Sequence, residues 1–274
     1  MARRRSDPVE RPAELGPAVP FPPQEAELVA ELPSGGGWQY EPKWDGFRGV
    51  LENDAGELAL WSRNGRPLLR YFPELRPLGE LLPPHSALDG EIVIAREGRL
   101  EFDLMQMRLH PAESRIRRLA AEMPAELVVF DCLLWDGEPV HELPLEERRA
   151  RVESLEGFRV SPATRDEEQA RKWLATLESA GLDGVVAKRL GLPYLPGSRE
   201  GVVKLKEHKT ADCVVVGVRW KEQDTRLATL LLGLYREDGG LDYVGSAAVA
   251  ARGHDAILET VRPLLDGAPD RGFS

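Results

Sequence analysis

Tyr40-Glu41-Pro42-Lys43-Trp44-Asp45-Gly46-Phe47-Arg48 places a lysine, a carboxylate, a glycine and an arginine within six positions of one another. A lysine on a rigid, mostly apolar element loses solvation, which leaves part of its amine free to attack an electrophile, so Lys43 is a candidate nucleophile. If the segment is extended, Asp45 shares the face of Lys43 and can hold a metal ion beside the attacked phosphate. Arg48, expected on that face too, offers a planar fork to phosphate or ribose oxygens. Gly46 permits close backbone approach of a ligand.

A solvated pair of Lys43 and Asp45 at a strand end is the alternative, and the residue types alone support both interpretations about equally. The string also resembles KxDGxR, the first motif of the covalent nucleotidyltransferases, which comprise ATP-dependent DNA ligases, RNA ligases and mRNA capping enzymes. In that family the lysine forms a covalent lysyl-nucleotide. The resemblance implies that Lys43 is the catalytic residue and that both Glu41 and Lys43 contact the nucleotide.

Length and composition limit the kind of protein that carries this site. With 274 residues, 42% of them hydrophobic, the chain can bury a sizeable core in one large or two modest domains. It has no apolar run near the roughly 20 residues that a membrane span needs, so we expect a cytoplasmic protein. Cys132 and Cys213 lie in valine-rich runs without metal-binding spacing, and both are expected in the core. The formal charge of −10 requires any DNA binding to use local basic patches.

Composition and turn signals divide the chain into three parts, residues 1–37, 38–207 and 208–274. The first is rich in Pro, Glu, Ala and Arg and is expected to be mostly irregular. By resemblance, the second is an α+β nucleotidyltransferase (ATP-grasp-like) domain of antiparallel sheets with flanking helices. The third is then an incomplete OB-fold β-barrel.

Hydrophobic periodicity gives the expected elements of each domain. In residues 38–207 the expected strands are 46–52, 57–62, 86–96, 126–135 and 201–206, the first two forming a hairpin. The expected helices are 73–82, one from about 111, and 166–180, and the family resemblance implies a further helix at 102–109. In residues 208–274 the expected strands are 214–220, 227–235 and 241–247, followed by a helix at 255–265.

Ser62-Arg63-Asn64-Gly65 should end the second strand, because Asn-Gly is a strong turn signal. Together with Tyr-Phe-Pro-Glu-Leu at 71–75, it resembles the second motif of bacterial end-joining DNA ligases. There the arginine contacts phosphate or the bound nucleotide. The resemblance implies nucleotide and DNA contacts for Arg63.

Glu91 and Phe130 both lie within apolar runs. A buried carboxylate without a partner is costly, so Glu91 should meet a ligand, a metal ion or a cation, and a structural ion pair is the alternative. Phe130 alone is most simply a core aromatic. However, Leu-Asp-Gly-Glu at 88–91 resembles the third family motif, whose glutamate binds the ribose. Phe130 occupies the position of the ring that stacks on the purine.

Leu-Asp-Gly-Val-Val-Ala-Lys at 182–188 resembles the fourth motif, usually EGVVAK, with Asp183 in place of the glutamate. The resemblance makes Asp183 a candidate metal ligand and Lys188 a nucleotide contact. Lys204 and Lys206 alternate along a strand, so both ammonium groups leave one face, which suits a triphosphate. This resembles the fifth motif, whose lysines bind the α-phosphate region.

Arg108, Arg115, Arg117 and Arg118 gather around the helix expected from about residue 111. Contact with the DNA backbone, through Arg115, Arg117 and Arg118 above all, and a solvated helix face are about equally supported.

The resemblance as a whole implies an ATP-dependent DNA ligase of the bacterial end-joining group. ATP and a divalent metal (Mg²⁺ or Mn²⁺) are the implied cofactors. The implied partners are nicked or broken double-stranded DNA and end-joining or repair proteins. The resemblance also implies a monomer that is located at the nucleoid. Alternatives are an RNA ligase or a GTP-using capping enzyme. Another is a truncated, weakly active nucleotide- or nick-binding protein, because the chain ends at Ser274 before the expected sixth motif.

Overall fold

The computed structural model describes residues 9–10, 16–177, 181–206, 211–221 and 226–265. The chain divides into two compact units, Met1–Glu207 and His208–Ser274. The domain boundary expected at 207–208 lies outside the described residues. None of the described helices is long and apolar enough to cross a lipid bilayer.

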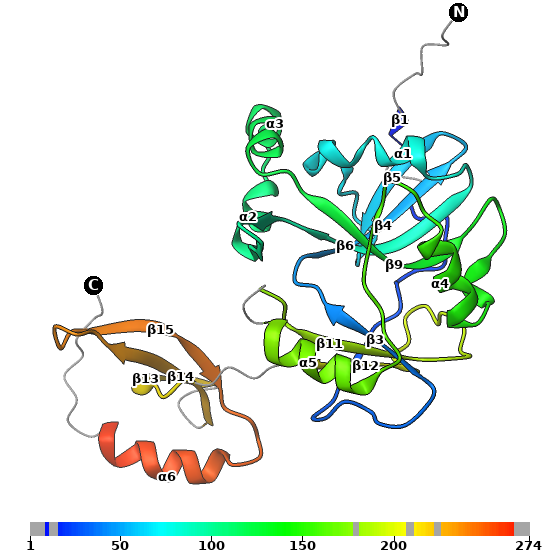
Figure 1. The fold of residues 1–274 in the computed structure, drawn as a ribbon. Helices are drawn as coiled ribbons and strands as arrows, with labels where there is room; N and C mark the ends of the chain where they lie inside the picture. Colours follow the sequence, from blue (N-terminus) through cyan, green and yellow to red (C-terminus); the bar gives the residue numbers. More distant parts are fainter. Residues whose placement is uncertain (1–8, 11–15, 178–180, 207–210, 222–225, 266–274) are drawn as a thin grey trace, which may run out of the picture. The chain divides into compact units, whose positions relative to one another are not determined.

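The first unit contains a six-stranded sheet with the strand order β1-β5-β4-β6-β9-β10 (Figure 1). The expected hairpin is confirmed, because β4 and β5 pair antiparallel with Asp54 opposite Glu57. At the two edges, β1 runs parallel to β5 and β10 runs parallel to β9. The strands are β1 (Val9–Glu10), β4 (Phe47–Asp54), β5 (Glu57–Ser62), β6 (Ser86–Val93), β9 (Glu126–Leu134) and β10 (Arg159–Val160).

A four-stranded sheet with the order β2-β12-β11-β3 completes the first unit, and its edge strand β2 runs parallel to β12. The sheets are therefore mixed and not purely antiparallel as predicted. Each parallel pair uses a two-residue strand, which is too short to show an alternating pattern in the sequence. Two of these strands, β1 and β2, lie in the segment expected to be irregular. The strands of this sheet are β2 (Glu27–Leu28), β3 (Trp38–Lys43), β11 (Gly184–Arg189) and β12 (Val202–Lys206).

Helices and short hairpin strands fill the connections of the first unit. The single helix expected at 73–82 is instead a 3₁₀ turn followed by a one-turn α-helix, because Pro77 has no N–H with which to continue a helix. The helices are α1 (Leu78–Leu81), α2 (Phe102–Arg108), α3 (Glu113–Glu122), α4 (Leu145–Glu153) and α5 (Glu167–Leu177). The 3₁₀ turns are η2 (Leu69–Tyr71), η3 (Pro73–Leu75) and η4 (Val140–Glu142), and β7 (Ala95–Arg96) pairs with β8 (Arg99–Leu100).

Helix α5 covers one face of the four-stranded sheet. Its Ala170 belongs to a buried cluster with Tyr40, Val185 and Ala187. Side chains alternate between the two faces of a strand, so the residues between these buried ones point to the opposite face. That face is consequently available for a functional site.

The second unit is an antiparallel sheet followed by a helix. The expected three strands and helix are observed at the predicted positions. In the part of this unit that the structure describes, the sheet stays open and forms no closed barrel. Its elements are β13 (Val214–Lys221), β14 (Arg226–Tyr235), β15 (Leu241–Ala248) and α6 (His254–Leu265).

The two cysteines differ in burial. Cys132 is a core residue as predicted, and burial raises the pKa of its thiol to about 12. Cys213 is only half-buried, which contradicts the prediction, because it precedes a strand whose first residues, Val214 and Val215, are themselves exposed.

Residues 44–46 carry the chain from β3 in the four-stranded sheet to β4 in the six-stranded sheet. The prediction that Lys43, Asp45 and Arg48 share one extended face is therefore wrong, because the strand of Lys43 ends at Lys43, Asp45 lies in the link, and Arg48 belongs to a strand of the other sheet. Within the link, Gly46 passes directly beside β6. A Cβ atom on Gly46 would lie 2.0 Å from the carbonyl oxygen of Ile92, so only glycine fits there.

We predict that Gly46→Ala lowers the free energy of unfolding by more than about 2 kcal/mol, because two backbone segments must separate to admit the methyl group. Chemical denaturation measures the loss. Gly36→Ala is the matched control, since a Cβ there meets nothing within 4 Å. Equal stability of the two variants would show that the link has room to adjust.

Candidate active site

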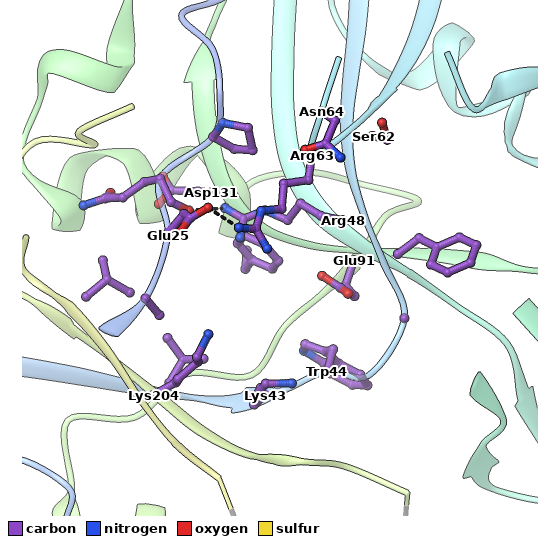
Figure 2. Close-up of a pocket in the computed structure, with 18 of the residues that line it drawn as sticks. Glu25, Lys43, Trp44, Arg48, Ser62, Arg63, Asn64, Glu91, Asp131 and Lys204 are labelled. Atoms are coloured by element: carbon purple, nitrogen blue, oxygen red, sulfur yellow. Dashed lines mark hydrogen bonds and ion pairs between the residues drawn. The ribbon is translucent and has the colours of Figure 1, made fainter. Parts of the chain in front are cut away.

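A cavity of about 930 Å³ in the first unit is lined by residues of both sheets. The four-stranded sheet contributes Glu41–Lys43 of β3 and alternate residues of β11 and β12, and the six-stranded sheet contributes residues of β4, β6 and β9. Figure 2 shows Lys43 and Lys204 across the cavity from Arg48 and Glu91. Eight of the nine residues expected to bind nucleotide line it, namely Glu41, Lys43, Arg48, Arg63, Glu91, Phe130, Lys188 and Lys204.

Lys43 and Lys206 are held together by one carboxylate. Both residues pair in register with Gly184 on the strand between them, which places the two lysines in one row across the sheet. The Oδ2 atom of Asp183 accepts a hydrogen bond of 2.8 Å from each Nζ. Burial opposes ionisation of Asp183, but the hydrogen bonds from Lys206 and Lys43 outweigh it and lower its pKa to about 2. Lys206 thus joins the site through Asp183 although it does not line the cavity.

Gly184 is required in this row for a steric reason. Its φ is +152°, and a Cβ atom would lie 2.0 Å from the carbonyl oxygen of Leu205.

Asp45 lies close enough to this cluster to interact with it electrostatically. Burial and the charge of Asp183 raise the pKa of the Asp45 carboxyl. Within the described residues Asp45 makes no hydrogen bond, and no group of three or more His, Cys, Asp or Glu side chains is placed to hold a metal ion. The two predicted metal ligands are therefore near each other, without a third protein ligand in the described part of the chain.

Lys188 and Glu41 form a buried pair at the back of the cavity. The Nζ atom of Lys188 lies 3.0 Å from the Oε1 atom of Glu41 and donates to the carbonyl oxygen of Phe130 at 3.2 Å. Gln39 donates a further hydrogen bond to Glu41 at 2.8 Å. This network fixes both residues where they face the cavity.

Arg48 is already engaged by Asp89. Its Nε and Nη2 atoms donate to the two carboxylate oxygens of Asp89 at 2.6 and 2.5 Å. The hydroxyl of Tyr194 donates to the same carboxylate at 2.6 Å. The guanidinium group that the sequence suggested for phosphate binding is thus bound to a carboxylate of the protein itself. Its carbon atom lies 4.8 Å from the centre of the Phe130 ring.

Phe130 faces the cavity because of a β-bulge. The pairing of β6 with β9 shifts between Asp89, opposite Asp131, and Gly90, opposite Val129, so Phe130 has no partner on β6. A bulge re-aims the side chain of its extra residue. Phe130 is half-buried and lines the cavity, so the alternative of a core aromatic is wrong.

Glu91 faces the cavity without a protein partner. The carboxylate is half-buried and makes no hydrogen bond or ion pair within the described residues. Burial raises its pKa to about 7, although the positive charges of Arg48 and Lys43 act in the opposite direction. The structural ion pair considered as an alternative is therefore not present among the described residues.

The predicted basic helix does not line the cavity. Arg117 and Arg118 are exposed and pair with Glu113 and Glu122 of the same helix, as on a solvated face. Arg115 is half-buried.

Arg108 was wrongly grouped with these exposed arginines. It is fully buried, and its Nη1 and Nη2 atoms donate to Glu74 at 2.7 and 2.8 Å. It therefore serves to join α2 to η3.

Several cavity residues had no signal in the sequence. Trp44 is held by a hydrogen bond of 2.9 Å from its Nε1 atom to the hydroxyl of Ser161, and only its position next to Lys43 could have suggested a role. Glu25 and Arg199 lie in irregular segments far apart in the chain. No local pattern links them.

Comparisons with known proteins agree with these motifs. Residues 23–206 match a family model described as "ATP dependent DNA ligase domain". DNA ligase C1 of Mycolicibacterium smegmatis is 42% identical over 259 residues, which cover 90% of this chain and 74% of that protein. The multifunctional non-homologous end joining protein LigD of Pseudomonas aeruginosa is 35% identical over 275 residues, covering 94% of this chain and 31% of that protein. The structure of mycobacterial DNA ligase D complexed with ATP and MES matches with a TM-score of 0.53 and 28% identity, covering 87% of this chain and 77% of that one. The family resemblance is confirmed.

We predict that Glu91→Gln stabilises the protein at pH 8 by on the order of 2 kcal/mol. The pKa of Glu91 is raised from 4.5 to about 7, so the folded state binds the extra proton and stability falls as pH rises through this window. The glutamine variant lacks this loss, and its advantage should vanish near pH 4.

Denaturation curves between pH 4 and 8 measure the difference. The control is Glu156→Gln, at an exposed glutamate outside the cavity. A pH-independent difference between wild type and Glu91→Gln would contradict the raised pKa.

Proposed function

The chain belongs to the family of ATP-dependent DNA ligases, and on that premise we propose that Lys43 is the nucleophile of its ligase reaction. Lys43 attacks the α-phosphorus of ATP and pyrophosphate leaves. The AMP then passes from the lysine to the 5′-phosphate at a nick. In the last step the 3′-hydroxyl attacks that phosphorus, and AMP departs as the phosphodiester bond forms.

The single observation that supports this proposal best is the position of Lys43 at the edge of the cavity. Its Nζ atom donates a hydrogen bond to Asp183, which also accepts one from Lys206. Lys204 lines the same cavity. Cations around a phosphoryl group stabilise the charge that develops during its transfer. The hydrogen bond to Asp183 holds the Nζ atom of Lys43 in position at the cavity.

The rest of the cavity suits the nucleoside. The half-buried ring of Phe130 can stack on a purine base, and the unpaired Glu91 carboxylate can accept hydrogen bonds from ribose hydroxyls. Arg48, held by Asp89, stiffens the wall beside Phe130. We propose these roles in place of direct phosphate binding by the fork of Arg48.

The charge of the cavity suits a polyanionic substrate. Eight Lys and Arg side chains line it against four Asp and Glu side chains, although the whole chain carries a formal charge of −10. We propose that nicked DNA approaches this basic opening, where Arg63 is exposed, and that Arg115, Arg117 and Arg118 contribute at most secondary contacts.

A divalent cation fits the proposed chemistry. Mg²⁺ binds through one or two carboxylates together with substrate phosphate oxygens. Asp45 and Asp183 are those carboxylates, and Asp45 has no hydrogen bond that a cation would have to displace among the described residues. Such an ion, Mg²⁺ or Mn²⁺, would neutralise charge on the phosphates when bound.

The second unit has a proposed role as part of an OB-fold that contacts DNA. Its three antiparallel strands and helix support this assignment. We further propose that the protein works as a monomer at nucleoid DNA with other end-joining proteins, as the likeness to LigD suggests.

We predict that Lys43→Ala abolishes covalent labelling by ATP carrying a labelled α-phosphate, measured on a denaturing gel with Mg²⁺ or Mn²⁺ present. A single amine at a cavity edge contributes little to folding, so the melting temperature should change little. The control is Lys172→Ala, at an exposed lysine on α5 that pairs with Glu168. Labelling of the Lys43 variant would exclude this residue as the nucleophile, and labelling of wild type by GTP instead of ATP would favour a capping enzyme.

We predict that Phe130→Ala weakens ATP binding about tenfold, whereas Phe130→Trp keeps it within about threefold, since stacking requires an aromatic face. Isothermal titration calorimetry measures both affinities. Equal losses in the two variants would indicate that the ring packs against protein groups only.

A further inference from the structure

Glu25 holds two exposed arginines together in the lining of the cavity. Its carboxylate accepts a hydrogen bond from Nη2 of Arg63 and another, at 3.1 Å, from Nε of Arg199 (Figure 2 shows the contact with Arg63). All three residues line the cavity. Hydrogen bonds from the two arginines lower the pKa of Glu25, against the smaller opposing effect of burial.

The two arginines come from different parts of the fold. Arg63 follows β5 of the six-stranded sheet, whereas Arg199 lies between β11 and β12 of the four-stranded sheet. Glu25 is attached to the connection that carries Arg199, because its N–H donates to the carbonyl oxygen of Ser198 at 2.8 Å. Gln24 adds a hydrogen bond of 2.8 Å to the carbonyl oxygen of Glu200. The ion pair of Glu25 and Arg63 therefore links the two arginine-bearing segments at the cavity, and a ligand received between Arg63 and Arg199 must displace it.

The cavity wall around Glu25 carries more positive than negative charge. Lys204, also on the cavity wall, interacts electrostatically with both Arg63 and Glu25. Three cations thus surround one carboxylate, which leaves an excess of two positive charges. A carboxylate between two guanidinium groups occupies the position that a phosphate group would take in an arginine clamp.

We propose that Glu25 is a specificity-determining residue. A terminal phosphate monoester displaces its carboxylate from Arg63 and Arg199, whereas a phosphodiester leaves both arginines bound to Glu25. The proposal rests on the DNA ligase function proposed above, where the monoester is the 5′-phosphate at a nick.

Charge is the physical basis of this selectivity. A phosphate monoester carries about −1.5 to −2 at neutral pH and presents three terminal oxygens. A phosphodiester in the DNA backbone carries a single negative charge, the same as the Glu25 carboxylate that it must displace. Glu25 therefore competes well against the diester and poorly against the monoester. A neutral side chain at this position would leave both arginines open to either group.

The test compares two nicked duplexes that differ only in a 5′-phosphate or a 5′-hydroxyl at the nick. Affinities of the full chain are measured by fluorescence anisotropy with EDTA and without ATP, so that no chemistry occurs. We expect wild type to favour the 5′-phosphate nick. In Glu25→Gln this preference should fall by about fivefold, mainly through tighter binding of the 5′-hydroxyl nick.

The matched control is Glu126→Gln. It makes the same change in net charge at an exposed ion pair, with Arg159, and neither residue lines the cavity. It should strengthen binding of both duplexes equally and leave the preference unchanged. Arg199→Ala should weaken binding of the 5′-phosphate nick more than that of the 5′-hydroxyl nick. Melting temperatures confirm that each variant is folded.

An unchanged preference in Glu25→Gln, or a wild type that binds both nicks equally, would overturn the role of Glu25 while leaving the ligase proposal intact. Binding of neither nick, together with no covalent labelling by ATP, would refute the proposed function and this inference with it.

Discussion

The short link between the two sheets is the constraint on which the rest of the site depends. Lys43 is the last residue of one sheet, and Phe47 is the first of a strand in the other. The chain crosses between them in three residues, and the crossing is possible because Gly46 lies against the backbone of β6. The amine of Lys43 is thereby fixed at the boundary of two rigid elements. Groups from both sheets can then face one cavity, so the proposed base, ribose and phosphate contacts need not come from a single surface.

Much of the fold was predictable, and the exceptions have clear physical reasons. The hairpin of β4 and β5 followed from turn residues and alternation, which act over a few positions. The two-residue edge strands carry no such pattern. The β-bulge at Phe130 was equally hidden, because the sequence of β9 is an unbroken apolar run and the irregularity exists only in its pairing with β6. For this reason periodicity identified the strand and could not show which way the ring points.

The site was predictable as a set of residues and less so as a set of contacts. Residue type and motif order indicated eight residues that line the cavity, but not the rest of its lining or which charges neutralise one another. Arg48 and Asp89 are 41 positions apart in the chain, and Glu25 and Arg199 are 174 apart. Such pairs form only after the strands are arranged. An arginine in a motif is therefore a reliable sign of an important position, whereas its partner has to come from the three-dimensional structure.

The contrast between an acidic chain and a basic cavity bears on how the protein searches for its substrate. Repulsion between the acidic surface and a polyanion extends over about a Debye length, roughly 8 Å at physiological salt, whereas the cavity cations act at contact. On the proposed function we expect most collisions with intact duplex to end quickly, because a continuous backbone cannot bring a free phosphate end into the cavity. Short residence on undamaged DNA would keep the protein from being sequestered by the far more numerous intact sites. The charge distribution that weakens binding to intact DNA would thus also shorten the search from one DNA break to the next.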